Sequence, residues 1–316
     1  MNIADMLNIR YVKLHFYLEI TEDCTLPCSK APAIRGGMGE MLLRANCIRD
    51  RKCDECDFFK ECIVQRTMYS QIENVPDFMN STDSVGYIID CNDFREHFKS
   101  GDTLRFDLTL FGKTICYFNQ YMQAIYALGQ NGLGKDKARF VVARVTNSDN
   151  QDILIGNDIY MNRYEVHTLA DYVAYRKKQL KNGVMENIIE FRSPLTVKYN
   201  GEFLKEFSVE PVTIALLRRL YILACFEGIM RDDCMSQILK RLFEECDMPV
   251  ILEQEISPVT VKRYSTRKDQ RIALKGIKGY MKIDKIQNEM LDLYLAAEII
   301  HIGKSTSFGF GKIRVR

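Results

Sequence analysis

The tetrapeptide Gly-x-Gly-Lys occurs twice in this chain of 316 residues, once at 132–135 and once at 309–312. Each copy follows a segment with the apolar spacing of a helix and precedes a segment that alternates like a strand. Glycine reaches positive φ and permits close backbone approach, so such a loop suits a tight passage from helix to strand. Gly-x-Gly-Lys is also a common turn sequence, but two copies in the same context favour a duplicated α+β domain.

The segments around each copy predict the same order of elements. Residues 11–20 alternate between apolar side chains and a polar, aromatic and basic face, which predicts a half-buried strand. In the first half we predict strand, helix, strand, strand, helix and strand at residues 11–20, 33–45, 85–91, 103–111, 115–128 and 140–145. In the second half the order roughly recurs at residues 187–199, 211–226 with 234–246, 259–264, 272–283, 289–297 and 313–315. This order is typical of the ferredoxin-like fold.

We therefore predict an α+β chain of two tandem ferredoxin-like domains (RRM-like, βαββαβ). The first would comprise residues 1–165, with a small four-cysteine metal-binding insertion at about 47–66. The second would comprise residues 186–316 and contain the glycine-rich loop, and a charged, partly helical connector at 166–185 would join the two. The chain length agrees with two domains of ordinary size.

Composition limits the class of protein. A hydrophobic content of 47% allows a sizeable core, and the net charge of +2 with a pI near 7.9 argues against a uniformly basic nucleic-acid domain. Any nucleic-acid site must therefore be a local patch, for which 16 Tyr and 17 Phe supply stacking groups in a chain without Trp.

The chain also lacks membrane and export signals. No apolar run approaches the roughly 20 residues that cross a bilayer. The N-terminal segment has no charged start, apolar core and cleavage site of a secretory signal. We expect a cytoplasmic protein with no membrane partner, in which several of the 11 cysteines are free thiols.

The C-terminal segment, residues 303–316, has the composition of an anion site. Its glycines and hydroxyl residues can direct successive N–H groups into one concavity, where a phosphate is the usual ligand. The strand that follows places three cationic side chains on one face, so the pattern suggests a polyanion such as RNA. The alternative is a tight loop before an edge strand. The residues expected to bind RNA are Gly303, Lys304, Ser305, Thr306, Ser307, Gly309, Gly311, Lys312, Arg314 and Arg316.

Four cysteines form the most specific metal signal, in the spacing Cys47-x5-Cys53-x2-Cys56-x5-Cys62. Four thiolates within 16 residues can enclose a tetrahedral ion, and neighbouring cationic residues can offset its charge. Because all four positions are cysteine, no ligand position stays open for water, and we predict a structural zinc site rather than a catalytic metal. An iron–sulfur cluster is a lesser alternative, and free thiols or a redox pair would bind no metal.

Histidines are scarce, and each is a candidate acid or base. His301 directly precedes the C-terminal loop, and His15 lies on the polar face of the first strand. His97 and His167 lie in acidic or connecting segments and are interpreted as solvated. Arg35 lies in the glycine-rich first turn of the first helix, where it could add contacts to a phosphate or simply lie at the surface. No Walker loop, His-Glu-x-x-His or Gly-x-Ser-x-Gly motif is present.

Taken together, these motifs resemble a known family. The segment from His301 to Gly311 resembles the glycine-rich loop of CRISPR-associated RAMP proteins, and is closest to that of the endoribonucleases that process CRISPR precursor transcripts. Residues 191–195, 216–228 and 278–280 fit the C-terminal domain of that family. Residues 34–39, followed by the four cysteines, resemble a cysteine-bearing branch of it.

The resemblance implies two ferredoxin-like domains that bind CRISPR precursor RNA along their cleft. It also implies metal-independent cleavage, in which the ribose 2′-hydroxyl attacks the adjacent phosphate and leaves a 2′,3′-cyclic phosphate and a 5′-hydroxyl. Many members place a catalytic histidine in or near the first helix, whereas this chain has none between Ile34 and Cys62. The catalytic candidates are therefore His301, His15 and Arg35, and CRISPR effector or adaptation proteins are candidate partners.

Two other functions stay open on the sequence alone. One is a non-cleaving RNA-binding subunit of a CRISPR effector assembly, which the missing first-helix histidine favours. The other is a zinc-stabilised adaptor between proteins, without an RNA role.

Overall fold

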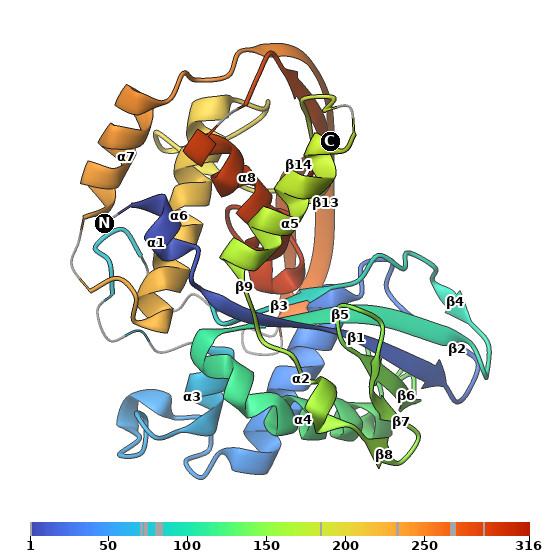
Figure 1. The fold of residues 1–316 in the computed structure, drawn as a ribbon. Helices are drawn as coiled ribbons and strands as arrows, with labels where there is room; N and C mark the ends of the chain where they lie inside the picture. The colour runs from blue at the N-terminus through green and yellow to red at the C-terminus, as the bar shows by residue number, and fades with distance from the viewer. Residues whose placement is uncertain are drawn as a thin grey trace.

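The structure, a computed structural model, consists of two antiparallel sheets with helices packed against them (Figure 1). It describes residues 2–69, 72, 75–79, 85–183, 185–231, 234–265, 270–286 and 288–316. The sheet of the first half lies across the lower part of the molecule in Figure 1, and the second half lies above it.

The sheet of the first half has its four principal strands in the order β3-β5-β1-β6. These are β3 (Tyr87–Asp90), β5 (Thr103–Phe111), β1 (Arg10–Ile20) and β6 (Phe140–Thr146). Helices α2 (Ala31–Asn46) and α4 (Phe118–Asn131) cover its lower face in Figure 1. Gly37 allows them to pack closely, since a methyl group there would lie 2.5 Å from the side chain of Leu128.

Shorter elements complete the first half. They are α1 (Ile3–Met6), β2 (Cys24–Thr25), η1 (Cys53–Glu55), α3 (Ile63–Met68), β4 (His97–Phe98), η2 (Gly112–Tyr117), β7 (Asp152–Ile155), β8 (Asp158–Ile159), η3 (Met161–Arg163) and β9 (His167–Thr168). Strands β7 and β8 extend the sheet beyond β6, while β2 pairs with β4 in a separate ribbon.

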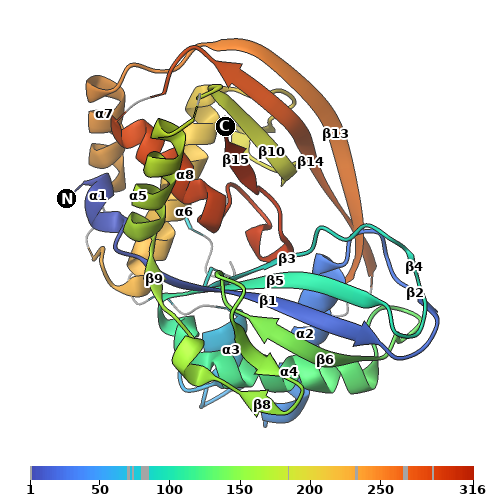
Figure 2. The ribbon, with the colours of Figure 1, turned by 45° about the vertical axis from the view of Figure 1, so that its right-hand side comes forward.

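The second half repeats the arrangement, with strands in the order β13-β14-β10-β15. Its elements are β10 (Ile188–Leu195), β11 (Lys198–Tyr199), β12 (Glu202–Phe203), α6 (Val209–Glu227), α7 (Met235–Glu245), β13 (Ile251–Ser265), β14 (Gln270–Ile283), α8 (Asn288–Ile300), η4 (Thr306–Phe308) and β15 (Ile313–Val315). Figure 2 shows β10 between β14 and β15, and the long β13–β14 hairpin beside them.

Both halves therefore have strand, helix, strand, strand, helix, strand along the chain and the same spatial order of the four strands. This confirms a mixed α/β chain with antiparallel sheets of ferredoxin-like order. The β13–β14 hairpin is longer than the alternation at 259–264 and 272–283 predicts, because Ile251 to Ser265 pair along almost the whole of β14.

The segment expected as a connector, 166–185, contributes elements to both halves. Thr168 of β9 pairs with Arg10 of β1. Helix α5 (Leu169–Lys181) begins at once, with the Thr168 hydroxyl accepting the N–H of Asp171 at 3.1 Å. It then packs beside α8, where Arg176 forms a buried ion pair with Glu298 at 2.9 Å (Figure 2).

The hydrophobic core of the second half contains residues from the start of the chain. Ile3, Met6, Leu7 and Ile9 are buried in the same cluster as α6 and α8. Figure 1 shows α1 beside α6, away from the rest of the first half. The strand segment that begins at Arg10 thus links the two cores.

Among the described helices, none combines the length and the apolar content needed to cross a membrane.

Candidate functional site

The glycine-rich loop, residues 301–312, lies where the two halves meet, and much of its backbone is bonded within the protein. The N–H groups of Lys304 and Gly311 donate to the carbonyl oxygens of Thr196 at 2.8 Å and Pro194 at 2.9 Å. Those of Phe308, Gly309 and Phe310 donate to carbonyls inside the loop. The expectation that these groups form an open concavity for phosphate is therefore wrong.

The small residues of the loop serve close packing instead. A methyl group on Gly311 would lie 1.8 Å from the carbonyl oxygen of Ile302, and one on Gly303 would lie 2.5 Å from that of Thr196. On Gly309 it would lie 2.8 Å from the carbonyl oxygen of Ile89 in the other half. Thr306 and Ser307 are buried, as are Gly309 and Gly311, so these four residues are not positioned to contact RNA. Gly303 is half-buried, and RNA contact there stays a prediction. Gly303 and Gly311 pack within the second half, and Gly309 packs against the first half.

The cationic face of β15 is also largely occupied. Lys312 forms an ion pair with Asp90 of β3, which joins the two halves. Arg314 pairs with the buried Glu298 at 2.9 Å, and Arg316 pairs with the exposed Glu186 at 3.2 Å. Carboxylates from distant segments therefore occupy Lys312 and Arg314, which the alternation of the strand did not reveal. Arg316 is exposed, and its contact with RNA stays a prediction.

Two further loop residues expected to bind RNA keep access to solvent. Lys304 is exposed, with its ammonium group 5.8 Å from the ring centre of Phe203. Ser305 is half-buried and has a left-handed backbone at φ 63°. RNA contact by these two residues stays a prediction.

His301, the first catalytic candidate, is only 4% exposed. Its Nδ1–H donates to the carbonyl oxygen of Phe310 at 3.0 Å. Burial, together with nearby Lys312 and Lys13, lowers the pKa of His301 well below its usual value, so the ring is neutral. Because the ring is buried and bonded within the protein, it has no open path to bound RNA, which argues against the catalytic assignment.

His15, the second candidate, is 7% exposed and belongs to a buried charged cluster between the two halves. Its Nδ1 lies 2.7 Å from Oδ1 of Asp107. Burial alone would raise the pKa of Asp107, but the bond to His15 and the charge of Lys13 lower that pKa to about 2. The His15 ring is thus held by a buried carboxylate, as is typical of a structural histidine.

Arg35, the third candidate, faces an arrangement that the sequence did not reveal. Its guanidinium carbon lies 4.9 Å from the ring centre of Phe308, and Arg263 of β13 approaches the same ring at 4.6 Å. Nε of Arg35 donates to the hydroxyl of Tyr87 at 3.1 Å, which orients the side chain. We call Arg35, Phe308 and Arg263 the arginine–phenylalanine cluster.

The cluster concentrates positive charge. Burial, followed by repulsion from Arg35, lowers the pKa of Arg263. Nε of Arg263 is buried and has no hydrogen-bond partner within the part of the chain that the structure describes. An anion bound between the two guanidinium groups would relieve their repulsion and supply an acceptor.

A groove of about 920 Å³ lies beside this cluster, and Arg263 lines it. One side is the N-terminal part of α2, including Gly36 and Gly37, and the other is the loop at 131–137, the first Gly-x-Gly-Lys copy. Cationic and acidic side chains both line it, and these are Arg44, Lys135, Lys137, Lys262, Arg263, Glu40, Glu96 and Asp136. The groove therefore offers a partly basic channel with Arg263 of the cluster in its wall.

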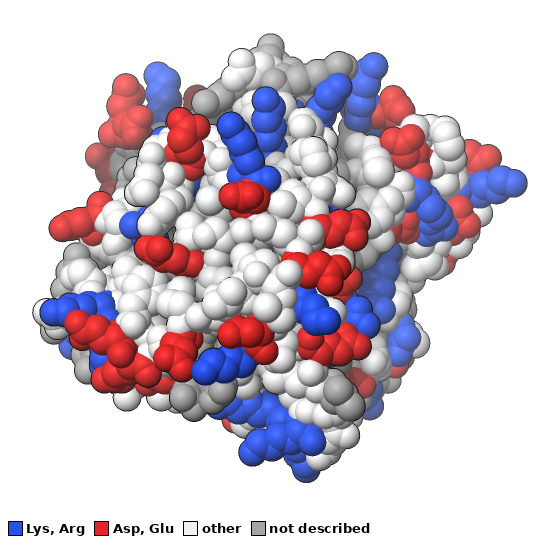
Figure 3. All heavy atoms as spheres, turned by 90° about the horizontal axis from the view of Figure 1, so that it is seen from above, with Lys and Arg blue, Asp and Glu red and all other residues white. Residues whose placement is uncertain are grey.

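Charge elsewhere is mixed. Figure 3 shows Lys and Arg interspersed with Asp and Glu over the upper face of the molecule, in keeping with the net charge of +2. Affinity for a polyanion must then come from a local site such as the cluster and its groove.

Sequence reasoning missed Arg263 and Phe308 as a pair, because 45 positions separate them and only the fold brings them together. It also set aside His97, whose Nδ1 lies 3.4 Å from Oγ1 of Thr25. Thr25 and Glu96 both line the groove, so the exposed His97 lies at its edge. Only the pairing of β2 with β4, which places His97 opposite Thr25, reveals this position.

The four cysteines of the predicted metal site, Cys47, Cys53, Cys56 and Cys62, line one cavity apart from the groove. Among the described residues, no three His, Cys, Asp or Glu side chains are close enough to hold an ion together. The metal is thus neither confirmed nor contradicted.

Two family models match the chain. Residues 8–171, more than half of it, match a model described as an N-terminal domain. Residues 189–313 match that of the CRISPR-associated endoribonuclease Cas6. None of the curated proteins compared matches the chain.

Solved Cas6 structures share the fold at low identity. A chain of a partial Cas6-RT-Cas1–Cas2 complex aligns over 98% of this chain with 12% identity and a TM-score of 0.60. The alignment covers only 46% of that longer chain. A Thermus thermophilus Cas6 in a product complex aligns over 98% of this chain and 100% of its own, with 13% identity and a TM-score of 0.51. A second Cas6 product complex aligns over 97% and 99%, with 16% identity and a TM-score of 0.50.

Proposed function

Since the chain belongs to the Cas6 family of CRISPR-associated RNA-processing endoribonucleases, we propose that it binds CRISPR repeat RNA and cleaves the precursor transcript. The proposed substrate path is the groove beside α2, and the scissile phosphate would lie at the arginine–phenylalanine cluster. The match to the endoribonuclease model supports the reaction class, and the groove geometry supports the location.

The observation that carries this proposal is the approach of Arg35 and Arg263 to one ring, that of Phe308. Two guanidinium groups in a partly buried position favour a dianionic or developing negative charge more strongly than they would in water. Both groups approach the apolar ring of Phe308. A phosphate held there is stabilised further as it becomes a phosphorane.

We propose metal-independent chemistry. The ribose 2′-oxygen forms a bond to the adjacent phosphorus, the bond from phosphorus to the 5′-oxygen breaks, and the 2′-hydroxyl proton is lost to a base while the leaving oxygen gains one. The products are a 2′,3′-cyclic phosphate and a 5′-hydroxyl. Arg35 and Arg263 supply the charge stabilisation, so this step needs no catalytic metal ion.

The test uses a labelled repeat RNA with EDTA present. We expect discrete cleavage, a 5′-hydroxyl on the downstream product, and no cleavage of RNA with a single 2′-deoxynucleotide before the scissile phosphate. Cleavage of the deoxy substrate, or dependence on added Mg²⁺, would overturn the mechanism. The protein's bound metal is measured before and after the EDTA treatment, so that loss of a structural ion is not mistaken for loss of a catalytic one.

Substitution of Arg263 tests the location. Arg263→Ala removes one of the two charges that face the phosphate, and we expect the single-turnover rate to fall about 100-fold. Lys282→Ala serves as the control, because Lys282 is an exposed cation near the other end of the same hairpin. Equal rates for Arg263→Ala and the wild type would place the chemistry elsewhere.

A second function, a non-cleaving RNA-binding subunit, is favoured by one observation. His15 and His301 are both buried, so neither can reach RNA in the groove. If the chain retains the repeat RNA intact while Arg263→Ala weakens binding, this function replaces the first.

We further propose CRISPR adaptation proteins as partners. The likeness to a chain of a Cas6-RT-Cas1–Cas2 complex supports this partner class. Failure of the purified chain to bind Cas1 from the same genome by size-exclusion chromatography would contradict it.

A further inference from the structure

The segment between α2 and α3, residues 47–62, has an unusual burial pattern. Its four cysteines are half-buried, and each of its other residues is exposed. Even the apolar residues Ile48 and Phe58 are 69% and 53% exposed. The segment therefore has almost no hydrophobic core of its own, and the side chains that turn inward are thiols.

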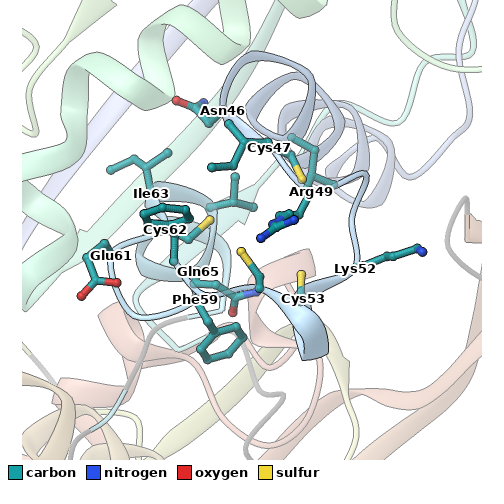
Figure 4. A pocket seen from close by; sticks show the side chains of 15 residues that line it. Asn46, Cys47, Arg49, Lys52, Cys53, Phe59, Glu61, Cys62, Ile63 and Gln65 are labelled. Carbon is teal, nitrogen blue, oxygen red and sulfur yellow. The ribbon is translucent and has the colours of Figure 1, made fainter.

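All four thiols face one space. Cys47, Cys53, Cys56 and Cys62 line a single cavity of about 250 Å³. Figure 4 shows the sulfur atoms of Cys47, Cys53 and Cys62 around the space enclosed by the loop and the start of α3. We propose that these four cysteines, whose sulfurs lie too far apart in this structure to hold an ion, draw together around one zinc ion as a tetrahedral tetrathiolate that joins the end of α2 to the start of α3.

The backbone between the first two ligands has the form of a tight turn around a sulfur. Asp50 and Arg51 have left-handed backbones, at φ 46° and 67°. This turn directs the N–H of Arg51 to Sγ of Cys47 at 3.2 Å. N–H donation to a ligand sulfur stabilises the thiolate form that zinc requires.

A second turn presents the central Cys-x-x-Cys pair. The N–H of Cys56 donates to the carbonyl oxygen of Cys53 at 3.3 Å, and that of Phe59 donates to the carbonyl of Cys56 at 3.1 Å. Cys53 and Cys56 are thereby held at the two ends of η1 with both side chains on the cavity side. Two sulfurs from one short turn are the usual half of a structural zinc site.

Charge around the cavity is compatible with this assignment. A zinc ion with four thiolates carries a net charge of −2. Arg49 and Lys52 both line the cavity. Arg51 already pairs with Glu40 at 2.6 Å, and Arg49 pairs with Asp57 at 2.7 Å, so Lys52 and the Arg51 N–H are the main compensating groups. Because sulfur fills all four positions, the ion has no place for a reacting water and is structural.

The position of the ligands explains what the ion would do. Cys47 directly follows the last residue of α2, and Cys62 directly precedes α3. Helix α3 is already fixed to α4, since the hydroxyl of Tyr121 donates to the carbonyl oxygen of Thr67 at 2.7 Å. Zinc would thus anchor the far end of α2, the helix that carries Arg35, without touching the proposed RNA groove.

The test is independent of RNA cleavage. Protein purified without chelator is analysed for metals by mass spectrometry, and we expect about one zinc per chain. Replacement of zinc by Co²⁺ should give the intense visible bands of tetrahedral cobalt–thiolate coordination. Cys53→Ser/Cys56→Ser should abolish these bands and lower the melting temperature by several degrees. Cys28→Ser, an exposed cysteine outside the cavity, should retain both properties.

Four results would overturn the proposal. They are a metal-free protein that also fails to bind Co²⁺, a disulfide among the four cysteines in freshly purified protein, an iron–sulfur absorption spectrum, and unchanged zinc content in the double variant. Should the double variant not fold, Cys47→His keeps a zinc ligand and should retain the metal with a shifted cobalt spectrum. None of these results depends on whether the protein cleaves RNA.

Discussion

His301 shows, at the residue scale, how burial keeps a side chain away from a substrate. His301 has a left-handed backbone at φ 59°, and its ring is bonded to the carbonyl oxygen of Phe310. Its position next to the glycine-rich loop favoured a catalytic role, but that position is itself inside the interface. The exposed cations near the groove are better placed to meet RNA.

His301 gives the first residue-scale prediction. Its folded pKa lies well below the unfolded value of 6.5, so below this pH the unfolded chain takes up a proton that the folded chain does not. Stability should therefore fall as pH drops below about 6.5, by up to about 1.4 kcal/mol per pH unit. His301→Asn, which tolerates the left-handed backbone and can donate to Phe310, should show a correspondingly flatter dependence.

Urea unfolding of the wild type and His301→Asn between pH 5 and pH 8 measures the difference. Parallel pH profiles would show that the ring is accessible to protons when folded. The same variant should also cleave RNA at the wild-type rate, and loss of cleavage in a folded protein would restore the catalytic assignment.

Lys304 gives the second residue-scale prediction. As the exposed cation of the glycine-rich loop, it is expected to contact an RNA phosphate. Lys304→Ala should weaken RNA binding and reduce the slope of log K against log salt by about 0.7, the value for one contact to a single strand. Titrations at several salt concentrations measure the slope, with Lys282→Ala as the control, and an unchanged slope would exclude the contact.

The glycine-rich loop shows at the element scale that one sequence pattern can serve two purposes. Glycines that can expose N–H groups to a phosphate can equally let two backbones pack closely. Here Gly309 and Gly311 approach carbonyl oxygens in both halves, which makes the loop a packing element. The neighbouring Phe308 is half-buried and contacts two arginines, so the loop still shapes the candidate site.

Replacement of Gly311 tests this element. Gly311→Ala combines a left-handed φ of 73° with a methyl group 1.8 Å from the Ile302 carbonyl oxygen, and should destabilise the protein by more than about 4 kcal/mol. Gly201→Ala is the control, because Gly201 has φ 86° but open space around it. That change should cost about 1–2 kcal/mol. Similar losses in chemical unfolding would show that the loop is not tightly packed.

At the scale of the whole molecule, contacts between distant segments join the two halves. The start of the chain is buried with α6 and α8, and Arg219 of α6 donates to the carbonyl oxygen of Val85 in the first half at 3.1 Å. The ion pair between Lys312 and Asp90 crosses the same interface. We therefore expect the halves to depend on each other for stability.

A pair of methionines tests this organisation. Met6 and Met38 are each fully buried, Met6 in the core of the second half and Met38 in that of the first. Either change to alanine should cost about 2–5 kcal/mol. Hydrogen exchange should show Met6→Ala losing protection first in α6 and α8, and Met38→Ala in α2 and α4. Loss confined to the first half for Met6→Ala would contradict the shared core.

The order of elements and the family follow from the sequence by itself, because they depend on local periodicity. Alternation predicts β5 at its observed residues, and the two Gly-x-Gly-Lys copies lie between helix and strand in both halves, as expected. The glycine-rich loop and its flanks were sufficient for the family resemblance, since such motifs are contiguous.

The tertiary structure alone decided which side chains are exposed to solvent and which groups they pair with. Lys312 meets a carboxylate 222 positions away, and Arg35 and Arg263 meet at Phe308 from three separate elements. Burial and charge pairing depend on groups that pack together from distant parts of the chain, so no local pattern contains them. For that reason the sequence identified the loop, whereas the fold determined that its amide hydrogens face carbonyl oxygens and that the open cationic site lies beside it.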